Sequence, residues 1–426
     1  MQKLSERLKV NKSLFPANVF KFSNGLTLIH QYLPATPVVV ADVWVRAGAI
    51  AEPQHWEGMA HFLEHMIFKG TKRLFPGEFD QIIENTGGVS NAATSHDYAH
   101  FVLTTAAQYL PETLPHLADL LLHAEITDEE FYRERDVVLE EIRGCYDNPD
   151  WIGFLALCET IYQSHPYKRS VLGEEAQIIR HTPNQMRCFH QTYYQPENMT
   201  VVIVGGVEQD TALNLVSKCF ADFNVRSECP PTFLDAEPPL IDIRSSYMYV
   251  PRMEQARLSM GWVGPGVEQL EDAFGLDLLS VVLASGQTSR LVRELREEKQ
   301  LVWDVFSEFS LQKDSSLFTI SAWLEPEHKE RVEESIRKEI LQLQTTPVQA
   351  TELARFKRIL CNDYIFSTET PGQLAGLYGY YNTIAEAELS MIYPARIQQL
   401  DSLELMRIAS QYLSPERYAR TILEPC

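Results

Sequence analysis

The chain repeats itself over its length, and this duplication constrains its fold more than any other feature. Trp44 and Trp262 lie in similar segments 218 positions apart, and the segments around Tyr193 and Tyr412 match in the same way. A strand-like segment follows each of these tyrosines. Because 426 residues exceed what a single hydrophobic core usually holds, the repeat predicts two related domains.

The seam between the two copies is rich in proline, which is typical of a linker. Four prolines mark it: Pro230, Pro231, Pro238 and Pro239. We therefore predict a first domain over residues 1–228, a linker over 229–245 and a second domain over 246–426. Within each copy, strand patterns, the first of them over residues 19–29, interleave with long amphipathic helices. This predicts an α+β fold with two homologous domains, each a mainly antiparallel sheet with helices packed on it.

A short motif sets the first copy apart, because residues 61 to 65 read His-Phe-Leu-Glu-His. On a helix, positions i and i+4 lie about one turn apart, so His61 and His65 can reach one metal ion. Glu64, three residues after His61, lies on the same side. The apolar neighbours face away and are predicted to pack in the core: Phe62, Leu63, Met66 and Ile67.

The second copy has no polar residue at the equivalent positions. A shift of 218 residues places the motif on Leu279, Val282 and Leu283, inside a predicted apolar helix over 274–284. If the fold required polar residues there, both copies should carry them. We therefore interpret the polar residues of the first copy as chemical rather than architectural.

Two histidines and a glutamate in this pattern are typical of a hydrolytic zinc site. Catalytic zinc takes three nitrogen or oxygen ligands from the protein and keeps a fourth position for water. A carboxylate beside that water serves as general base. We predict that His61 and His65 are ligands and that Glu64 is the base. A bare motif also occurs by chance on solvated helices, but the apolar flanks argue against that reading here.

The third ligand must come from elsewhere, and an acidic helix after Thr127 is the best candidate. Thr127 and Glu130 form a capping-box pattern that predicts the helix start. Glu134 and Glu141 lie two turns apart on one face of this helix. One of them could bind the metal while the other supports the site from behind. Taken alone, such an acidic run is more often a solvated helix face.

A second histidine pair with the same spacing, His96 and His100, provides a comparison. Its surroundings, residues 89–104, are rich in Ser, Thr, Tyr, Phe and Val, which predicts a strand. Four strand steps span roughly 13 Å, too far for two side chains to share one ion. We interpret these two histidines as structural.

Charge and cysteine content restrict the partners and the compartment. The chain has 37 basic and 58 acidic residues, a formal charge of −21, which argues against a nucleic acid partner. Seven cysteines without Cys-x-x-Cys spacing are typical of free thiols in a reducing compartment. No apolar run reaches the roughly 18 residues of a membrane span, and residues 1–16 lack the apolar core of a secretory signal. We expect a cytoplasmic protein.

The zinc motif, the acidic helix and the duplication together resemble the M16 metallopeptidases, the family of pitrilysin, insulin-degrading enzyme and the mitochondrial processing peptidases. The length is similar to that of the short-chain subgroup. The resemblance implies that the domains are halves of a clamshell around an enclosed chamber. It also implies one Zn²⁺ per chain and hydrolysis of unfolded peptides or presequences. Glu141, 76 residues after His65, matches the third ligand, and Glu134 matches a supporting residue behind the metal.

The resemblance extends to substrate contacts. Asn91 and Ala92 match the edge strand that holds substrate in the family, and we assign a structural role to the similar segment 165–173. Arg296 matches an arginine of the second domain that binds substrate, but Trp303 stands where the family has a tyrosine. This departure suggests a heterodimer in which a homologous subunit supplies the missing groups, with a homodimer as the alternative. The competing function is that of a non-catalytic structural subunit.

Overall fold

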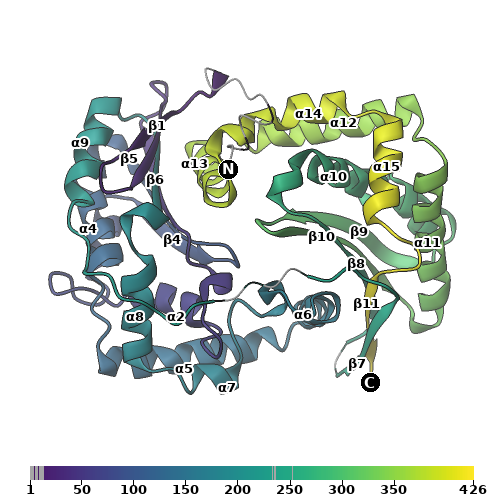
Figure 1. The fold of residues 1–426 in the computed structure, drawn as a ribbon, viewed down its shortest axis with the longest axis horizontal. Helices are drawn as coiled ribbons and strands as arrows, with labels where there is room; N and C mark the ends of the chain where they lie inside the picture. Colours follow the sequence, from purple (N-terminus) through teal and green to yellow (C-terminus); the bar gives the residue numbers. More distant parts are fainter. Residues whose placement is uncertain (1–3, 5–7, 9–13, 233, 235–236, 252) are drawn as a thin grey trace. The chain divides into compact units, whose positions relative to one another are not determined.

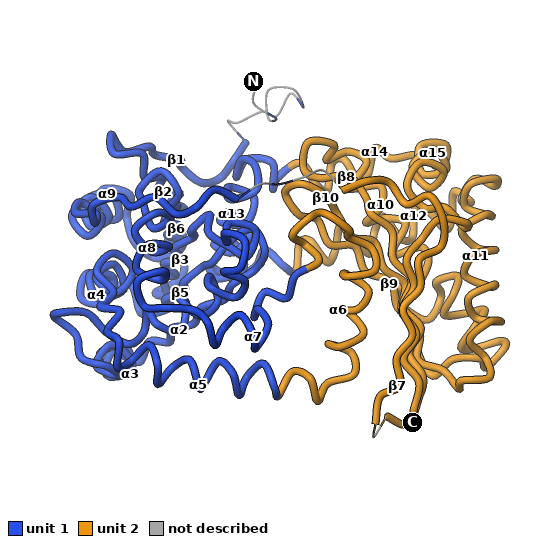
Figure 2. The backbone as a smooth tube through the Cα atoms, turned by 60° about the horizontal axis from the view of Figure 1, so that its bottom comes forward, with its two compact units in different colours: residues 1–143, 169–234, 367–391 blue, residues 144–168, 235–366, 392–426 orange. Residues whose placement is uncertain are grey.

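The computed structural model describes residues 4, 8, 14–232, 234, 237–251 and 253–426, and Figure 1 shows its elements. Most of the N-terminal segment on which we predicted no secretory signal lies outside these residues. The chain forms two compact units, each built from separate segments, as Figure 2 shows by colour. Unit 1 comprises residues 1–143, 169–234 and 367–391; unit 2 comprises residues 144–168, 235–366 and 392–426. Among the described residues, no helix is long and apolar enough to cross a membrane.

Unit 1 contains a six-stranded sheet in the order β1-β2-β6-β3-β5-β4. Its strands are β1 (Asn18–Lys21), β2 (Thr27–Tyr32), β3 (Val38–Val45), β4 (Val89–Thr94), β5 (Ala99–Ala106) and β6 (Met199–Gly205). β2 and β6 run parallel, and every other neighbouring pair is antiparallel. The central strands β3 and β6 are rich in valine and almost wholly buried, which suits a sheet covered on both faces.

Helices cover both faces of this sheet. They are α2 (Met59–Ile67), α3 (Glu78–Asn85), α4 (Leu110–His123), α5 (Asp128–Cys145), α7 (Glu175–Ile178), α8 (Pro183–Tyr193), α9 (Gln209–Cys219) and α13 (Pro371–Ile384). Trp44 and Tyr378 belong to the core cluster that α13 forms on one face. Phe101 points to the opposite face and contacts the rings of Phe68, just after α2, and Tyr194, just after α8. The second face therefore carries α2.

Unit 2 repeats this plan with one strand fewer, in the order β7-β11-β8-β10-β9. Its strands are β7 (Arg244–Val250), β8 (Ala256–Pro265), β9 (Val302–Leu311), β10 (Ser315–Leu324) and β11 (Ala419–Pro425). Its helices are α6 (Pro149–Ile161), α10 (Leu270–Ala284), α11 (Lys329–Thr345), α12 (Ala350–Phe366), α14 (Tyr393–Gln399) and α15 (Ser402–Tyr412). β7 and β11 are parallel, as β2 and β6 are in unit 1. The predicted α+β fold with two homologous domains is confirmed.

The units depart from the predicted contiguous halves because two helices are exchanged. α6 comes from the first half of the chain but packs on β8 and β11 of unit 2, and α13 comes from the second half but packs on β3 and β6 of unit 1. A glycine permits each close approach. A Cβ at Gly261 would lie 3.3 Å from side-chain atoms of Leu157 and Ile161, and one at Gly379 would lie 2.0 Å from the indole nitrogen of Trp44. No local pattern in the sequence reveals this exchange.

Two segments that we read as single strands are hairpins. The first strand, expected over residues 19–29, is interrupted after Lys21 by a turn in which Gly25 has φ 103°. The expected strand over residues 89–104 is likewise split into β4 and β5 by a turn around His96, which the backbone bond from Ser95 N to Tyr98 O closes at 2.7 Å. Both turns carry turn residues, Ser-Asn-Gly at 23–25 and Ser-His-Asp at 95–97, which the two strand assignments did not take into account.

Candidate metal centre

The start of α2 is held from outside the helix. Gly58, at the N-cap, has φ 84°, and its N–H and that of Ala60 donate to the carboxylate of Glu52 at 3.0 and 2.8 Å. Burial raises the pKa of Glu52 to about 8. A Cβ at Gly173 would lie 2.7 Å from the Cα of Gly58, so the end of segment 165–173 packs against the helix start. These contacts fix where α2 begins.

The apolar side of α2 is buried as its sequence predicted. Phe62 also meets Phe131 of α5, with ring centroids 4.7 Å apart. This contact sets the two helices side by side (Figure 1). Histidines of α2 then face glutamates of α5. All four residues predicted to pack in the core are fully buried: Phe62, Leu63, Met66 and Ile67.

Three candidate ligand atoms converge between α2 and α5. Glu141 Oε2 lies 3.7 Å from His61 Nε2 and 3.3 Å from His65 Nε2. Ligands at roughly 2.1 Å from a tetrahedral zinc ion lie about 3.4 Å apart, so the three side chains fit such an ion. In the part of the chain that the structure describes, this is the one group of three or more His, Cys, Asp or Glu side chains placed to share a metal.

The protonation state of His61 and the hydrogen bond of His65 also fit a metal. Burial, followed by the charge of His65, lowers the pKa of His61 to about 4, which favours the neutral imidazole that binds metals. His65 Nδ1 lies 3.0 Å from Glu134 Oε1. When Nδ1 donates to this carboxylate, Nε2 of the neutral ring is free to bind a cation.

Glu134 lies behind His65 rather than in the ligand group. Lys69 Nζ lies 2.7 Å from Glu134 Oε2. Burial alone would raise the pKa of Glu134, but the hydrogen bonds from His65 and Lys69 hold it below its usual value. Burial lowers the pKa of His65, whereas the bond to Glu134 and the charge of Glu141 raise it overall. The structure thus separates the two glutamates that the helix pattern left equivalent.

Glu64 lies beside the ligand group and is held by β4. Thr94 Oγ1 donates to Glu64 Oε2 at 2.6 Å. Burial raises the pKa of Glu64, although the hydrogen bond from Thr94 opposes the shift. A carboxylate with a raised pKa next to a metal is suited to take up a proton and release it again.

Asn91 and Ala92 lie on β4, an edge strand of the sheet, as expected. β4 pairs only with β5, so its outer edge is free of other strands among the described residues. Side chains along β4 alternate between exposed and half-buried. Ala92 N–H donates to Asn91 Oδ1 at 3.0 Å.

The two second-domain residues, Arg296 and Trp303, lie in unit 2. Arg296 belongs to a π-helix, Val292–Glu298, and contacts Asp304 at 3.2 Å. Trp303 is 61% exposed, and its indole N–H donates to Glu325 at 3.3 Å. The single donor of Trp303 is therefore already used by a neighbour in its own unit.

The comparison pair, His96 and His100, lies outside the ligand group. His96 Nε2 lies 3.0 Å from the carbonyl oxygen of Arg169, and His100 Nδ1 lies 3.0 Å from the buried carboxylate of Asp42. We predicted that these two histidines do not share a metal, and among the described residues neither belongs to the group that could hold one.

Comparison with known proteins identifies the family. The model described as insulinase (peptidase family M16) matches residues 27–175, and the model described as peptidase M16 inactive domain matches residues 180–360. The zinc protease PqqE of Helicobacter pylori is 31% identical over 409 residues, which cover 94% of this chain and 91% of that protein. The chain belongs to peptidase family M16.

Other M16 relatives agree. The uncharacterized zinc protease YmxG of Bacillus subtilis is 26% identical over 411 residues, covering 94% of this chain and 97% of that protein. The crystal structure of a protease from Helicobacter pylori superimposes with a TM-score of 0.90 at 29% identity and covers 96% of this chain and 99% of that one. The predicted recognition of an M16 zinc metallopeptidase is confirmed.

Three residues that contact the side chains or the helix of this site were not predicted from the sequence. Lys69 follows His65 by four positions, so the stripe of His61 and His65 could have been extended to it. Thr94 lies in the segment that matched the substrate strand, but nothing local pairs it with Glu64. Glu52 had no signal, because a loop carboxylate that caps a helix six or eight residues later leaves no regular pattern.

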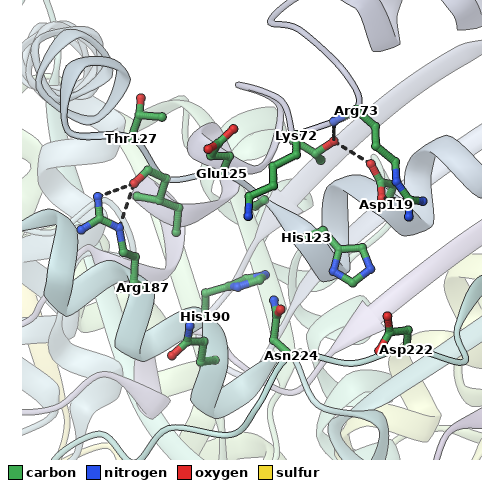
Figure 3. A pocket seen from close by; sticks show the side chains of 14 residues that line it. Lys72, Arg73, Asp119, His123, Glu125, Thr127, Arg187, His190, Asp222 and Asn224 are labelled. Carbon is green, nitrogen blue, oxygen red and sulfur yellow. Dashed lines mark hydrogen bonds and ion pairs between the residues drawn. The ribbon is translucent and has the colours of Figure 1, made fainter.

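A cavity of about 600 Å³ lies in unit 1, and Figure 3 shows the side chains that line it. Lys72 and Arg73, which follow α2, line it together with Asp119, Glu125 and Asp222. The lining mixes both signs of charge and contains none of the three candidate ligands. We assign it no role in the metal site.

Proposed function

We propose that this chain is a zinc endopeptidase that holds one Zn²⁺ through His61, His65 and Glu141. The observation that carries this proposal is the convergence of one nitrogen from each imidazole and one carboxylate oxygen within 4.8 Å of one another. A bound zinc ion polarises a peptide carbonyl and lowers the pKa of its water to near neutrality.

The remaining residues would move and hold protons around that centre. Glu64 would accept the proton of the attacking water and pass it to the leaving amine. Thr94 binds one oxygen of Glu64 and so leaves the other free for this transfer. Glu134 would keep His65 in the tautomer that presents Nε2, and Lys69 would keep Glu134 ionised.

We propose extended, unfolded peptides or presequences as substrates, bound along β4. A free sheet edge binds any extended chain through backbone hydrogen bonds, whereas a folded segment cannot follow it. Asn91 and Ala92 lie in the middle of this edge. An incoming peptide carbonyl would take the Ala92 N–H from the side chain of Asn91. The net charge of −21 favours basic or neutral peptides.

We propose that a homologous subunit completes the site, and that a heterodimer is the active form. The support is Trp303, which replaces a tyrosine and whose N–H already binds Glu325. Arg296 lies on a π-helix, a feature that occurs frequently at functional sites. A subunit with the usual arginine and tyrosine should raise peptidase activity by about tenfold or more, a share of the oxyanion term. Equal activity of the chain alone would indicate a self-sufficient homodimer.

We also propose a cytoplasmic location, which rests on the cysteine pattern of the sequence. An odd number of cysteines without Cys-x-x-Cys spacing suits a reducing compartment. Fractionation of cells and the thiol content of the protein isolated under acid quench would test it. Recovery in an oxidising compartment would contradict this part of the proposal.

The variant Glu64→Gln tests the peptidase function. It keeps the shape of the side chain and removes the base, so zinc content should stay near one per chain. Cleavage of an unfolded peptide should fall by roughly 10²- to 10⁴-fold. Glu140→Gln is the matched control, because Glu140 is exposed on α5 and pairs with Arg143. Near-normal turnover by Glu64→Gln would refute Glu64 as the general base, whereas a wild type without zinc and without peptidase activity would favour a non-catalytic subunit.

A further inference from the structure

Two cysteines that are distant in the sequence meet in unit 1. Cys188 lies on α8, and Cys229 lies in the irregular segment that follows α9. Their Sγ atoms are 3.4 Å apart, across 41 residues of sequence. The two sulfurs of a disulfide are about 2.0 Å apart, so a small movement of either side chain would allow a bond.

The segment around Cys229 is held on α8 by polar contacts. Thr192 Oγ1 lies 3.0 Å from the carbonyl oxygen of Ser227 and 3.3 Å from Cys229 Sγ, and it accepts the N–H of Cys229 at 3.1 Å. Cys188 Sγ also lies 3.3 Å from Ser227 Oγ. These contacts keep the two thiols together in the reduced state.

Metal binding and simple packing account less well for this pair. The two thiols do not belong to a group of three or more potential ligands among the described residues. Cys158 is a packing cysteine, because it is 4% exposed, but Cys188 and Cys229 are only partly buried and remain accessible to a small reagent.

We propose that Cys188 and Cys229 are a reversible thiol–disulfide pair, oxidised by a low-molecular-weight disulfide such as oxidised glutathione. The Cys188 thiolate attacks one sulfur of the reagent, and the first reagent thiol leaves with a proton. Cys229 then loses its proton and attacks the Cys188 sulfur, which releases the second reagent thiol. The protein loses two electrons and two protons, and the reagent disulfide is reduced to two thiols.

The order of attack follows from the surroundings of the two groups. Burial raises the pKa of the Cys229 thiol to about 12, so it is rarely a thiolate at neutral pH. Cys188 is therefore the first nucleophile, and Cys229 is the resolving thiol. Closure should be slow, because the second step needs the proton of Cys229 to leave.

The bond would tie down a segment that reaches the metal helix. Thr232 Oγ1 and Tyr193 OH both donate to the carbonyl oxygen of Ala51, at 3.0 and 2.8 Å. Ala51 precedes Glu52, which caps α2. Closing a loop of this length should raise the melting temperature Tm on the order of 5 °C.

The full-length protein is the object of the test. The zinc-loaded chain is incubated with oxidised glutathione, alkylated, and digested without reductant. We expect a cross-linked pair of peptides that contain Cys188 and Cys229, an intact mass lower by two hydrogens, and a higher Tm that dithiothreitol reverses. Cys188→Ser and Cys229→Ser should abolish all three, while Cys219→Ser, a partly buried cysteine of α9, should keep them.

Two results would overturn the proposal. One is stable glutathionylation of Cys188 without closure to Cys229, and the other is a disulfide that joins either residue to a different cysteine. If a serine variant fails to fold, the cross-linked peptide in the wild type still decides the matter. None of these readouts depends on peptidase activity, so the proposed function is tested separately.

Discussion

The helices α2 and α10 occupy equivalent places in the two units but differ in what they bury. α10 places Leu279, Val282 and Leu283 in the core, each fully buried. α2 places His61, Glu64 and His65 at the matching positions, where His61 is still 7% exposed. The fold therefore accepts apolar residues at these positions and does not require polar ones. Unit 1 has less apolar packing here and has a set of candidate ligands instead, as expected where function is favoured over stability.

A second position shows the same difference between the units. His190 of α8 matches Ala409 of α15, and both are buried. His190 Nε2 bonds to the carbonyl oxygen of Leu121 at 2.7 Å, which ties α8 to α4. Unit 1 thus has titratable groups, among them the candidate metal ligands, at places where unit 2 has apolar residues.

The largest effect is expected when the α10 residues are moved into α2. The triple variant His61→Leu, Glu64→Val and His65→Leu should lose all stoichiometric zinc and all peptidase activity. Its Tm should be at least that of the zinc-free wild type, because three apolar side chains replace polar ones in a half-buried stripe. Elemental analysis and calorimetry measure the two quantities.

His116→Leu, on α4 outside the motif, is the control and should keep its zinc. An unfolded triple variant would show that the polar residues are needed by the fold, and the comparison of α2 with α10 would fail.

The reverse exchange tests unit 2. Leu283→His should destabilise the protein by about 4 kcal/mol, because it removes a buried apolar side chain and leaves a polar ring without partners. Chemical denaturation followed by fluorescence measures the loss. Leu341→His, at a position of α11 that is 49% exposed, should change stability by less than about 0.5 kcal/mol. If Leu283→His changes stability as little as this control, unit 2 tolerates polar residues at these positions. The comparison of α2 with α10 would then say nothing about the need for apolar packing.

Acid should weaken unit 1 through His190. Burial, opposed by the Leu121 carbonyl, lowers the pKa of His190 from 6.5 to about 4 in the folded state. The unfolded state therefore binds the proton first, so stability is complete above pH 6.5 and is lost as the pH falls toward 4. The loss amounts to about 3 kcal/mol.

His190→Gln keeps a donor for Leu121 but does not titrate, so its free energy of unfolding should depend less on pH between 6.5 and 4. Parallel profiles of wild type and variant would assign the acid sensitivity to other groups.

The smallest effect is expected for Glu134, which contacts His65 from the side away from the candidate metal position. Glu134→Ala removes the partner of His65 Nδ1 and should lower zinc affinity or kcat/KM by roughly 10- to 100-fold, without abolishing either. Asp136→Ala, an exposed residue on the same helix, is the control. Lys69→Met should cost less, since it leaves the bond between His65 and Glu134 in place. A wild-type zinc affinity and rate for Glu134→Ala would make Glu134 an ordinary helix residue.

Much of the candidate site could be predicted because its features are local. The i,i+4 spacing of His61 and His65 places both rings on one side of any helix. Thr127 indicated the start of α5, and the structure has its hydroxyl accepting Glu130 N–H at 3.2 Å. The turns within residues 19–29 and 89–104 were missed, because the strand assignments gave no weight to the turn residues Ser-Asn-Gly and Ser-His-Asp.

The sequence by itself determined the duplication, the α+β class and the positions that carry the chemistry, because periodic patterns and spacing within one helix are local properties. The helix pattern left open which glutamate completes the group of His61 and His65, and the tertiary structure places Glu141 there, as the family resemblance implied. Only the tertiary structure decided that Thr94 holds Glu64 and that α6 and α13 exchange places. These relations join residues from different elements, and the packing of side chains such as Phe62 on Phe131 sets the distances between them. Glu134 and Glu141 are equivalent positions along α5 alone, and they became distinct because α2 packs against that helix.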